Sequence, residues 1–229
     1  MSVDKEGSHN LMKKETSQKE ASQKEILQKE MSQENAAHKR AMQETQTQVR
    51  NAVKQAKERR GVIIFLYGNG KGKSSSGFGT LLRAVGHGQR AAIVQFIKGN
   101  WQTGEQLFFR DHPRITHHVM GTGFTWDTQD REKDAAAAKD VWRYAQSELS
   151  DPSVNLVLLD EITYMFDYDY LPLDACIKAL CDRPPKQNVI LTGRTPVPEL
   201  IELADTVSEI NEIKHAFNAG VRAQKGIEF

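Results

Sequence analysis

The sequence of 229 residues has only two cysteines and no long apolar run. Cys176 and Cys181 match neither a CxxC motif nor a metal-binding pair, so we interpret them as ordinary thiols in a reducing compartment. No apolar run reaches the roughly 18 residues that a membrane-spanning helix needs. The N-terminus also lacks the apolar segment of a secretory signal. We therefore predict a cytoplasmic protein without a membrane partner.

The first 60 residues contain no proline and none of Phe, Tyr and Trp. Within them the pentads SQKEA, SQKEI, LQKEM and SQENA run from Ser17 to Ala36. Five residues advance a helix by about 140° beyond a full turn, so a pentad repeat makes no apolar stripe. The few apolar side chains cannot offset the entropy of ordering the backbone. Residues 1–40 are therefore predicted to form a low-complexity extension, disordered or transiently helical.

Between residues 41 and 60 the pattern becomes that of a narrow amphipathic helix. Met42, Val49, Val53 and Ala56 fall near one side of it. A narrow apolar stripe favours docking on something larger. We predict an N-terminal lid helix over residues 41–60, followed by a folded domain over 61–229.

That folded domain has no excess of basic charge. The first 60 residues hold 13 of the 31 Lys and Arg and 9 of the 30 Asp and Glu, which leaves 18 basic against 21 acidic residues for the remainder. A broad basic face is therefore not expected, and this argues against a nucleic-acid partner.

Beyond residue 61 short apolar runs alternate with helical patterns. This alternation predicts an α/β fold: a P-loop NTPase-like parallel sheet with helices on both faces. Ligands of such sheets bind beyond the carboxyl ends of the strands. The predicted strands are 62–67, 91–97, 115–120, 154–159, 188–192 and 206–210, and the predicted helices are 73–85, 103–110, 129–149, 172–182 and 197–204.

The stretch GNGKGKSSS follows the first predicted strand and opens the first helix. It gives G-x-x-x-G-K-S, one residue shorter than the usual phosphate-binding loop. Glycines let backbone N–H groups approach a phosphate, Lys73 neutralises its charge, and the Ser74 hydroxyl is a Mg²⁺ ligand. The alternative is a glycine turn that only connects strand to helix. The residues expected to hold the nucleotide are Gly68, Asn69, Gly70, Lys71, Gly72, Lys73, Ser74 and Ser75.

The ends of other strands supply further candidates. The run LVLLDE delivers Asp160 and Glu161 to the carboxyl edge, an arrangement like a Walker B motif that predicts a metal role for at least one of them. Lys98 and Arg194 follow two other strands, where each is either a phosphate ligand or a solvated charge.

The loop GTGFTWDTQ carries two large aromatic side chains, Phe124 and Trp126. They either fill the core or form a wall for a large, flat, apolar ligand.

Several of these segments together resemble the ATP:corrinoid adenosyltransferases of the CobA/BtuR/CobO type. The motifs that carry the resemblance appear in the same order over about residues 45–229. One departure is SSS at 74–76, where the family has threonines after the lysine. The segments are GNGKGK, RAVGHG, VQFIKG, GTGFTWDTQ, LLDEITY, DYLPL, LTGR, ADTVSEI and KHAF-AGV-AQ-GIEF.

The resemblance implies a reaction at carbon. Family members transfer the 5′-deoxyadenosyl group of ATP to the Co(I) of a reduced corrinoid and release triphosphate, with Mg²⁺ or Mn²⁺ as the metal. It implies catalytic roles for Lys73, Phe124 and Trp126, the two aromatic residues acting against the lower face of the corrin. It further implies a homodimer, a flavoprotein reductase as electron donor, and a lid helix over the site. The alternative interpretation of the P-loop alone is an NTPase or kinase that cleaves at phosphorus.

Overall fold

The computed structural model describes residues 31, 33, 35, 38–97, 102–121 and 130–229. The chain divides into two compact units, Met1–Glu58 and Arg59–Phe229, which we describe separately. Among the described residues, no helix combines the length and apolar character needed to cross a membrane.

The first unit contains a helix that covers residues 38–55. Its apolar side chains Met42, Val49 and Val53 are all exposed. The role of this helix as a lid stays a prediction, and most of the predicted extension at residues 1–40 lies outside the described residues.

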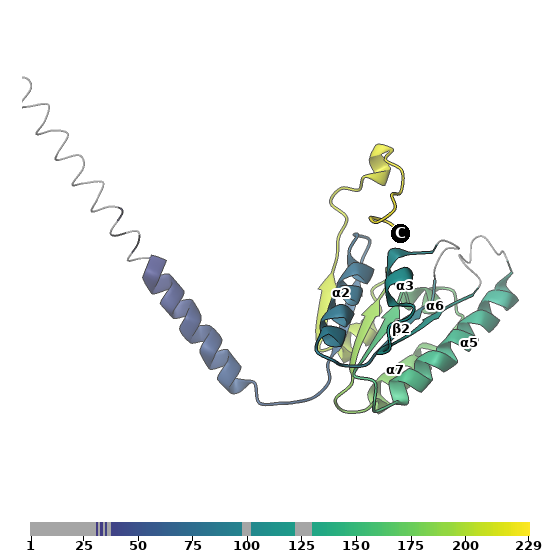
Figure 1. The fold of residues 1–229 in the computed structure, drawn as a ribbon, viewed down its shortest axis with the longest axis horizontal. Helices are drawn as coiled ribbons and strands as arrows, with labels where there is room; N and C mark the ends of the chain where they lie inside the picture. The colour runs from purple at the N-terminus through teal and green to yellow at the C-terminus, as the bar shows by residue number, and fades with distance from the viewer. Residues whose placement is uncertain (1–30, 32, 34, 36–37, 98–101, 122–129) are drawn as a thin grey trace, which may run out of the picture. The chain divides into compact units, whose positions relative to one another are not determined.

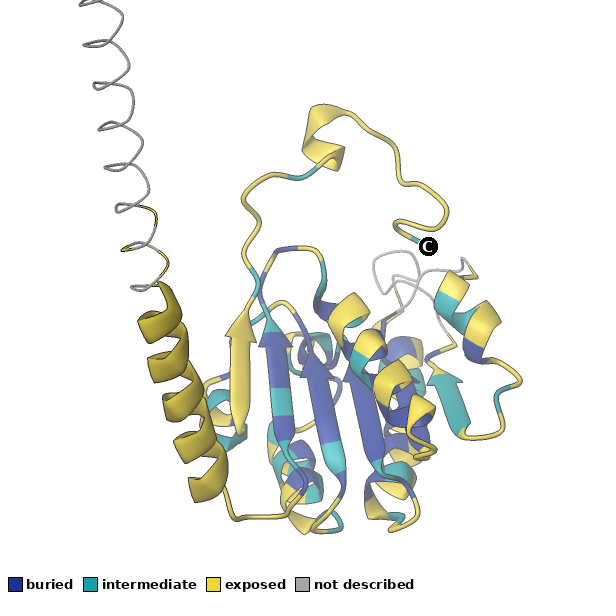
Figure 2. Cartoon of the chain, turned by 60° about the vertical axis from the view of Figure 1, so that its left-hand side comes forward, coloured by how far each residue is buried: buried dark blue, intermediate teal, exposed yellow. Residues whose placement is uncertain are grey.

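The second unit is built on a twisted sheet with helices packed beside it (Figure 1). The sheet is parallel and has six strands in the order β3-β2-β4-β5-β1-β6. The four inner strands are mostly buried, whereas β6 is exposed and β3 is half-buried (Figure 2). The strands are β1 (Ile63–Tyr67), β2 (Ala91–Gln95), β3 (Ile115–Val119), β4 (Leu156–Asp160), β5 (Asn188–Thr192) and β6 (Thr206–Glu209).

Side chains alternate along each inner strand between two apolar clusters, one on each face of the sheet. Leu158 and Ile190 pack with Leu81 of α2 (Lys73–Gly86) and Phe109 of α3 (Gly104–Phe109). Their neighbours along the strands pack on the other face, against the remaining helices. Near-continuous apolar strands are required because both faces are covered. The remaining helices are α5 (Arg131–Ser150), α6 (Thr163–Asp167), α7 (Leu173–Asp182) and α8 (Pro198–Leu203).

The predicted α/β fold with helices on both faces is confirmed. Each of the six predicted strands and five predicted helices is present, with ends within two residues of the prediction. The short helix α6 and the one-turn 3-10 helix η1 (Phe217–Ala219) were not predicted.

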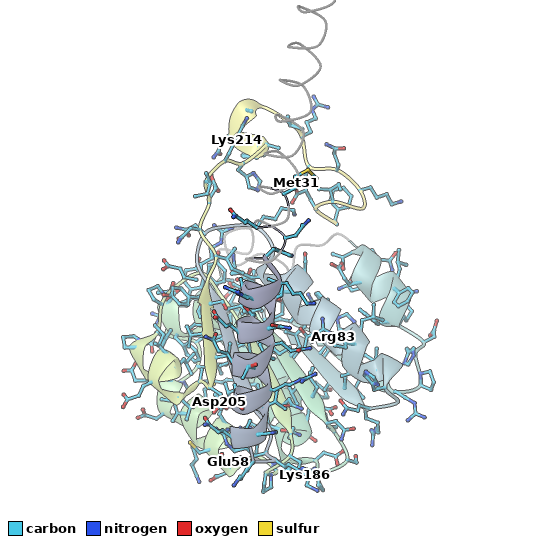
Figure 3. All side chains as sticks on the ribbon, turned by 90° about the vertical axis from the view of Figure 1, so that its left-hand side faces the viewer. Met31, Glu58, Arg83, Lys186, Asp205 and Lys214 are labelled. Carbon is cyan, nitrogen blue, oxygen red and sulfur yellow. The ribbon has the colours of Figure 1, made fainter. Side chains whose placement is uncertain are left out.

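Because all six strands are parallel, their carboxyl ends meet at one edge of the sheet. A C-terminal segment, residues 211–229, leaves the end of β6 beyond this edge. In Figure 3 Lys214 of that segment and the pair Asp205 and Lys186 lie at opposite ends of the sheet. The carboxyl edge is therefore where the P-loop, the end of β4 and the C-terminal segment are found together.

Candidate active site

The phosphate-binding loop occupies residues 68–72 between β1 and α2. Gly68 and Gly72 have φ values of 113° and 120°, a region that other residues rarely adopt. A Cβ on Gly68 would also come within 2.5 Å of the Ile210 carbonyl oxygen. The Gly70 N–H donates to that same oxygen at 2.7 Å. The loop is thus held against the end of β6. Gly68 is favoured both by its φ and by this close contact, and Gly72 is favoured by its φ.

The helix that follows the loop is open to an anion at its N-terminus. α2 begins at Lys73 with Gly72 as its N-cap, and no side chain caps its first N–H groups. Its first turn contains no acidic residue. Unpaired N–H groups and the positive end of the helix dipole favour a bound phosphate at this position.

Lys73 points back into the loop rather than into solvent. Its side chain is buried, and its Nζ donates to the Gly70 carbonyl oxygen at 2.9 Å. Burial lowers the pKa of Lys73 below its usual value, and Arg194 lowers it further, whereas Glu161 and Asp160 act to raise this pKa. A desolvated ammonium held at the centre of the loop gains from a polyanionic ligand more than an exposed lysine would.

At the end of β4 one carboxylate is buried in the sheet and the next one reaches the cavity. Asp160 is 1% exposed, and its oxygens accept hydrogen bonds from Thr192 and Gln95. Glu161 has a φ of 59°, a left-handed conformation that costs a non-glycine residue about 1–3 kcal/mol. The turn carries Glu161 to the cavity described below.

Arg194 reaches the same cavity from the end of β5. Its backbone N–H donates to Thr163 Oγ1 at 3.1 Å, and its carbonyl oxygen accepts from the Gly68 N–H at 3.2 Å. The backbone is therefore fixed to both α6 and the P-loop, while the side chain is exposed. A guanidinium on a fixed backbone is suited to binding phosphate oxygens.

A cavity of about 950 Å³ lies over these groups. It brings together most of the predicted nucleotide ligands, the predicted metal ligands Ser74 and Glu161, and Arg194. Gly68 and Asp160 support it from behind without lining it. Lys98, Phe124 and Trp126 lie outside the described residues. The lining includes Asn69, Gly70, Lys71, Gly72, Lys73, Ser74, Ser75, Glu161 and Arg194.

Two walls of the cavity consist of residues that the sequence analysis did not predict to be part of the site. One is formed by α2 and α3, with Phe78 and Phe108. The other is the C-terminal segment, whose Glu228 forms an ion pair with Lys71 of the P-loop at 2.7 Å. The topology could have indicated the C-terminal wall. Because β6 is parallel to β1, the segment after β6 must begin at the same edge of the sheet as the P-loop after β1.

The donor atoms of the site suit a hard metal ion. Within the described ranges, no group of three His, Cys, Asp or Glu side chains could hold a metal by itself. Ser74 and Glu161 offer oxygen ligands beside a phosphate-binding loop. Mg²⁺ prefers such sites, since it takes one or two protein ligands and completes its shell with waters and phosphate oxygens.

Comparison with known proteins agrees with this site. Residues 59–229 match the family described as ATP:corrinoid adenosyltransferase BtuR/CobO/CobP. The corrinoid adenosyltransferase of Escherichia coli K12 is 52% identical over 187 residues, which cover 82% of this chain and 95% of that protein. Corrinoid adenosyltransferase CobA of Salmonella typhimurium LT2 is 51% identical with the same coverage. The Pseudomonas aeruginosa corrinoid adenosyltransferase is 49% identical over 189 residues, 82% of this chain and 93% of that protein. The chain is therefore a member of the ATP:corrinoid adenosyltransferase family.

Proposed function

We propose that this enzyme transfers the 5′-deoxyadenosyl group of ATP to the cobalt of a reduced corrinoid and releases triphosphate. The observation that carries the proposal is the shortened P-loop with its buried Lys73, set in a cavity of about 950 Å³ beside Glu161 and Arg194. The corrinoid acceptor is inferred from family membership, and the binding site for the triphosphate leaving group is inferred from the loop.

The reaction is a substitution at carbon. The electron pair of Co(I) forms the bond to C5′ while the C5′–O5′ bond breaks, and its electrons leave on the terminal oxygen of triphosphate. Cobalt becomes formally Co(III) bound to carbon. No proton is taken from the nucleophile, so the site needs no general base. The protein must instead hold the triphosphate, stabilise its developing charge and direct C5′ at cobalt.

The described residues are suited to these tasks. Lys73 and the N–H groups at the start of α2 would bind the triphosphate, and Arg194 would reach its far oxygens. Ser74 and Glu161 would hold Mg²⁺ or Mn²⁺, which supplies further positive charge next to the leaving group. Removing the charge of Lys73 should therefore weaken both ATP binding and departure of triphosphate.

We propose that the loop GTGFTWDTQ, residues 121–129, acts on the corrinoid. Phe124 and Trp126 would press on the lower face of the corrin and exclude its lower axial ligand. Four-coordinate Co(II) is easier to reduce than a five-coordinate centre, so a weak reductant suffices. We further propose that Lys98 contacts the substrates, that the enzyme is a cytoplasmic homodimer, and that a flavoprotein reductase donates the electron.

The test is an anaerobic reaction with ATP, Mg²⁺ and chemically reduced corrinoid. The absorbance spectrum should change to that of an alkylated corrinoid, and chromatography should recover triphosphate in equal amount. ADP and phosphate as the main products, with no cobalt–carbon bond, would instead identify an NTPase or kinase that cleaves at phosphorus.

A further inference from the structure

A layer of polar side chains crosses the sheet behind the cavity. It involves four strands that are neighbours in the sheet, and its members are the last residues of β2, β4 and β5 and the middle residue of β3. The His117 Nε2 lies 2.9 Å from Gln95 Oε1, and Gln95 Nε2 donates to Asp160 Oδ2 at 2.9 Å. Thr192 Oγ1 donates to Asp160 Oδ1 at 2.7 Å. Gln95, Asp160 and Thr192 are all buried, so the layer is part of the sheet rather than a solvated edge.

Asp160 is at the centre of this layer and has both carboxylate oxygens occupied. Gln95 approaches it from one side and Thr192 from the other. Asp160 does not line the cavity, whereas Glu161 does. A metal in the cavity would therefore meet Glu161, and a direct bond to Asp160 would require both hydrogen bonds to be given up.

Thr192 connects Asp160 to Glu161. A hydroxyl has a single hydrogen, and Thr192 donates it to Asp160. The lone pairs of the same oxygen are thereby turned toward the Glu161 backbone N–H, which donates to it at 2.9 Å. The Thr192 carbonyl oxygen accepts from the Ile162 N–H at 3.0 Å. One residue thus holds the backbone on both sides of the Glu161 carbonyl group.

These contacts account for the unusual backbone at Glu161. A non-glycine residue persists at a φ of 59° only when its surroundings determine that conformation. The two hydrogen bonds to Thr192 do so, and Asp160 fixes the direction of one of them. The Glu161 backbone is therefore held by Thr192, a residue that does not line the cavity.

We propose that Asp160 and Thr192 are positioning residues for the metal site: Asp160 orients the Thr192 hydroxyl, which holds Glu161 in the left-handed conformation that presents its carboxylate to the metal. This inference rests on the proposed role of Glu161 as a ligand of Mg²⁺ or Mn²⁺.

ATP in solution binds Mn²⁺ by itself, so the experiment titrates the protein into a fixed equimolar mixture of Mn²⁺ and ATP without corrinoid. Binding is followed as the electron paramagnetic resonance spectrum changes from that of the free Mn²⁺–ATP complex to that of the protein-bound complex. Thr192→Val keeps the shape of the side chain but loses the hydroxyl, and Thr192→Ser is its matched control. Loss of a residue that supports a metal ligand costs about 10- to 100-fold in affinity, so Thr192→Val should weaken Mn²⁺ binding by at least about tenfold and Thr192→Ser by less than about threefold.

A second pair separates positioning from direct ligation. Asn at position 160 can still accept from Thr192, and Gln95 can turn its amide to accept from the new NH₂ group. Asp160→Asn should therefore stay within about fivefold of wild type, whereas Glu161→Gln should lose at least about tenfold. In turnover, Thr192→Val should raise the Mg²⁺ concentration needed for the half-maximal rate by a larger factor than the factor by which it lowers the rate at saturating Mg²⁺. Melting temperatures show which variants are folded.

The outcomes are decisive in either direction. Equal losses for Asp160→Asn and Glu161→Gln would make Asp160 a ligand and overturn the proposal, as would wild-type Mn²⁺ affinity in Thr192→Val. If Thr192→Val does not fold, the comparison of Asp160→Asn with Glu161→Gln still decides whether Asp160 binds the metal directly, and direct binding would overturn the proposal. The measurement involves no transfer reaction, so a protein that binds Mn²⁺ and ATP as described but makes no adenosylated corrinoid would refute the proposed function and leave this inference standing.

Discussion

Lys73 is the residue on which the proposed chemistry depends most. Its ammonium is buried in the P-loop and, within the described part of the chain, donates to the loop's own backbone at Gly70. A charge-assisted hydrogen bond contributes about 1.5–3 kcal/mol, and triphosphate offers several oxygens to this one group. We expect Lys73→Ala to reduce adenosylation by at least about 100-fold, measured as the initial rate of formation of alkylated corrinoid under anaerobic conditions.

Lys71 provides the matched control for that substitution. It lies in the same loop and lines the same cavity, but its side chain is exposed and paired with Glu228. Because exposed ion pairs contribute little, Lys71→Ala should cost less than about tenfold. Equal losses for the two variants, or an enzyme indifferent to Lys73→Ala, would refute the assignment of Lys73 as the central phosphate ligand.

The lowered pKa of Lys73 predicts a pH dependence of ATP binding. Burial favours the neutral amine, so the group loses its proton at a lower pH than the ordinary 10.5 of a lysine. ATP requires the ammonium form. Its affinity should therefore weaken as the pH rises, and should do so below the 10.5 of an ordinary lysine, which calorimetric titration at a series of pH values would measure.

Lys73→Ala is the reference for this pH series. The variant has no titrating group at that position, so its weaker affinity should change little over the same range. Parallel losses in the wild type and the variant would assign the pH dependence to another group and not to Lys73.

At the level of helices and strands, the apolar runs were sufficient to predict the sheet. Runs such as 154–159 are near-continuous because both faces of a parallel sheet are covered, and this pattern is local in the sequence. The order of the strands and the polar layer are not local. Gln95 and Thr192 look like ordinary strand-end residues until β2, β4 and β5 are placed side by side. Their contacts to Asp160 arise only from that pairing.

The candidate site also combines features that are local in the sequence with features that arise only from strand pairing. The position of the P-loop and of the adjacent Asp160 and Glu161 at the carboxyl edge could be predicted, because both segments directly follow apolar runs that are local in the sequence. The C-terminal wall could not be predicted from spacing, since residues 211–229 have no strong periodicity. The pairing of β6 with β1 and the Lys71–Glu228 ion pair bring this segment to the cavity. The left-handed backbone of Glu161 likewise has no sequence signal.

The opposite end of the sheet should show a pH-dependent contribution to stability. Asp205, just before β6, accepts hydrogen bonds from the Arg60 guanidinium and from the Ile63 N–H at the start of β1. These contacts lower the pKa of Asp205 to about 2 from 3.8. A depressed pKa stabilises the fold above the unfolded value, and the stabilisation is lost as the pH falls from about 4 to about 2.

Asp205→Asn should therefore lower the free energy of unfolding at pH 7 by about 1–2 kcal/mol, measured by denaturant titration. The difference between wild type and variant should shrink below pH 4 and be small at pH 2. Since every other titrating group is shared by the two proteins, their difference isolates Asp205. A difference that stays constant from pH 7 to pH 2 would show that the carboxylate charge plays no part.

At the scale of the whole molecule, the two units of the chain differ in what they can bury. The second unit has apolar clusters on both faces of its sheet. The helix at residues 38–55 instead exposes Met42, Val49 and Val53, which fall near one side. An apolar stripe on an otherwise polar helix is stabilised by a surface that covers it. This is the physical basis for the proposed lid, and it separates that helix from the pentad region before it.

Two truncations test this division. Deleting residues 1–35 should leave the adenosylation rate and the melting temperature almost unchanged, because the pentads place their few apolar side chains all around a helix. Deleting residues 1–58 removes Met42, Val49 and Val53 as well. Without the proposed lid, water would reach the corrinoid and the lower axial ligand could return. The rate that starts from Co(II) should then fall more than the affinity for ATP.

Both truncations are measured under the same anaerobic conditions, starting once from Co(II) and once from Co(I) supplied ready-made. The longer deletion should be impaired mainly in the first reaction, since the lid is proposed to favour the four-coordinate Co(II) that a weak reductant can reduce. Melting curves verify that Arg59–Phe229 remains folded, as expected of a unit with its own core. An inactive shorter deletion would assign a role to the pentads. A fully active longer deletion would show that residues 41–60 are not a lid, because the site would then be complete without them.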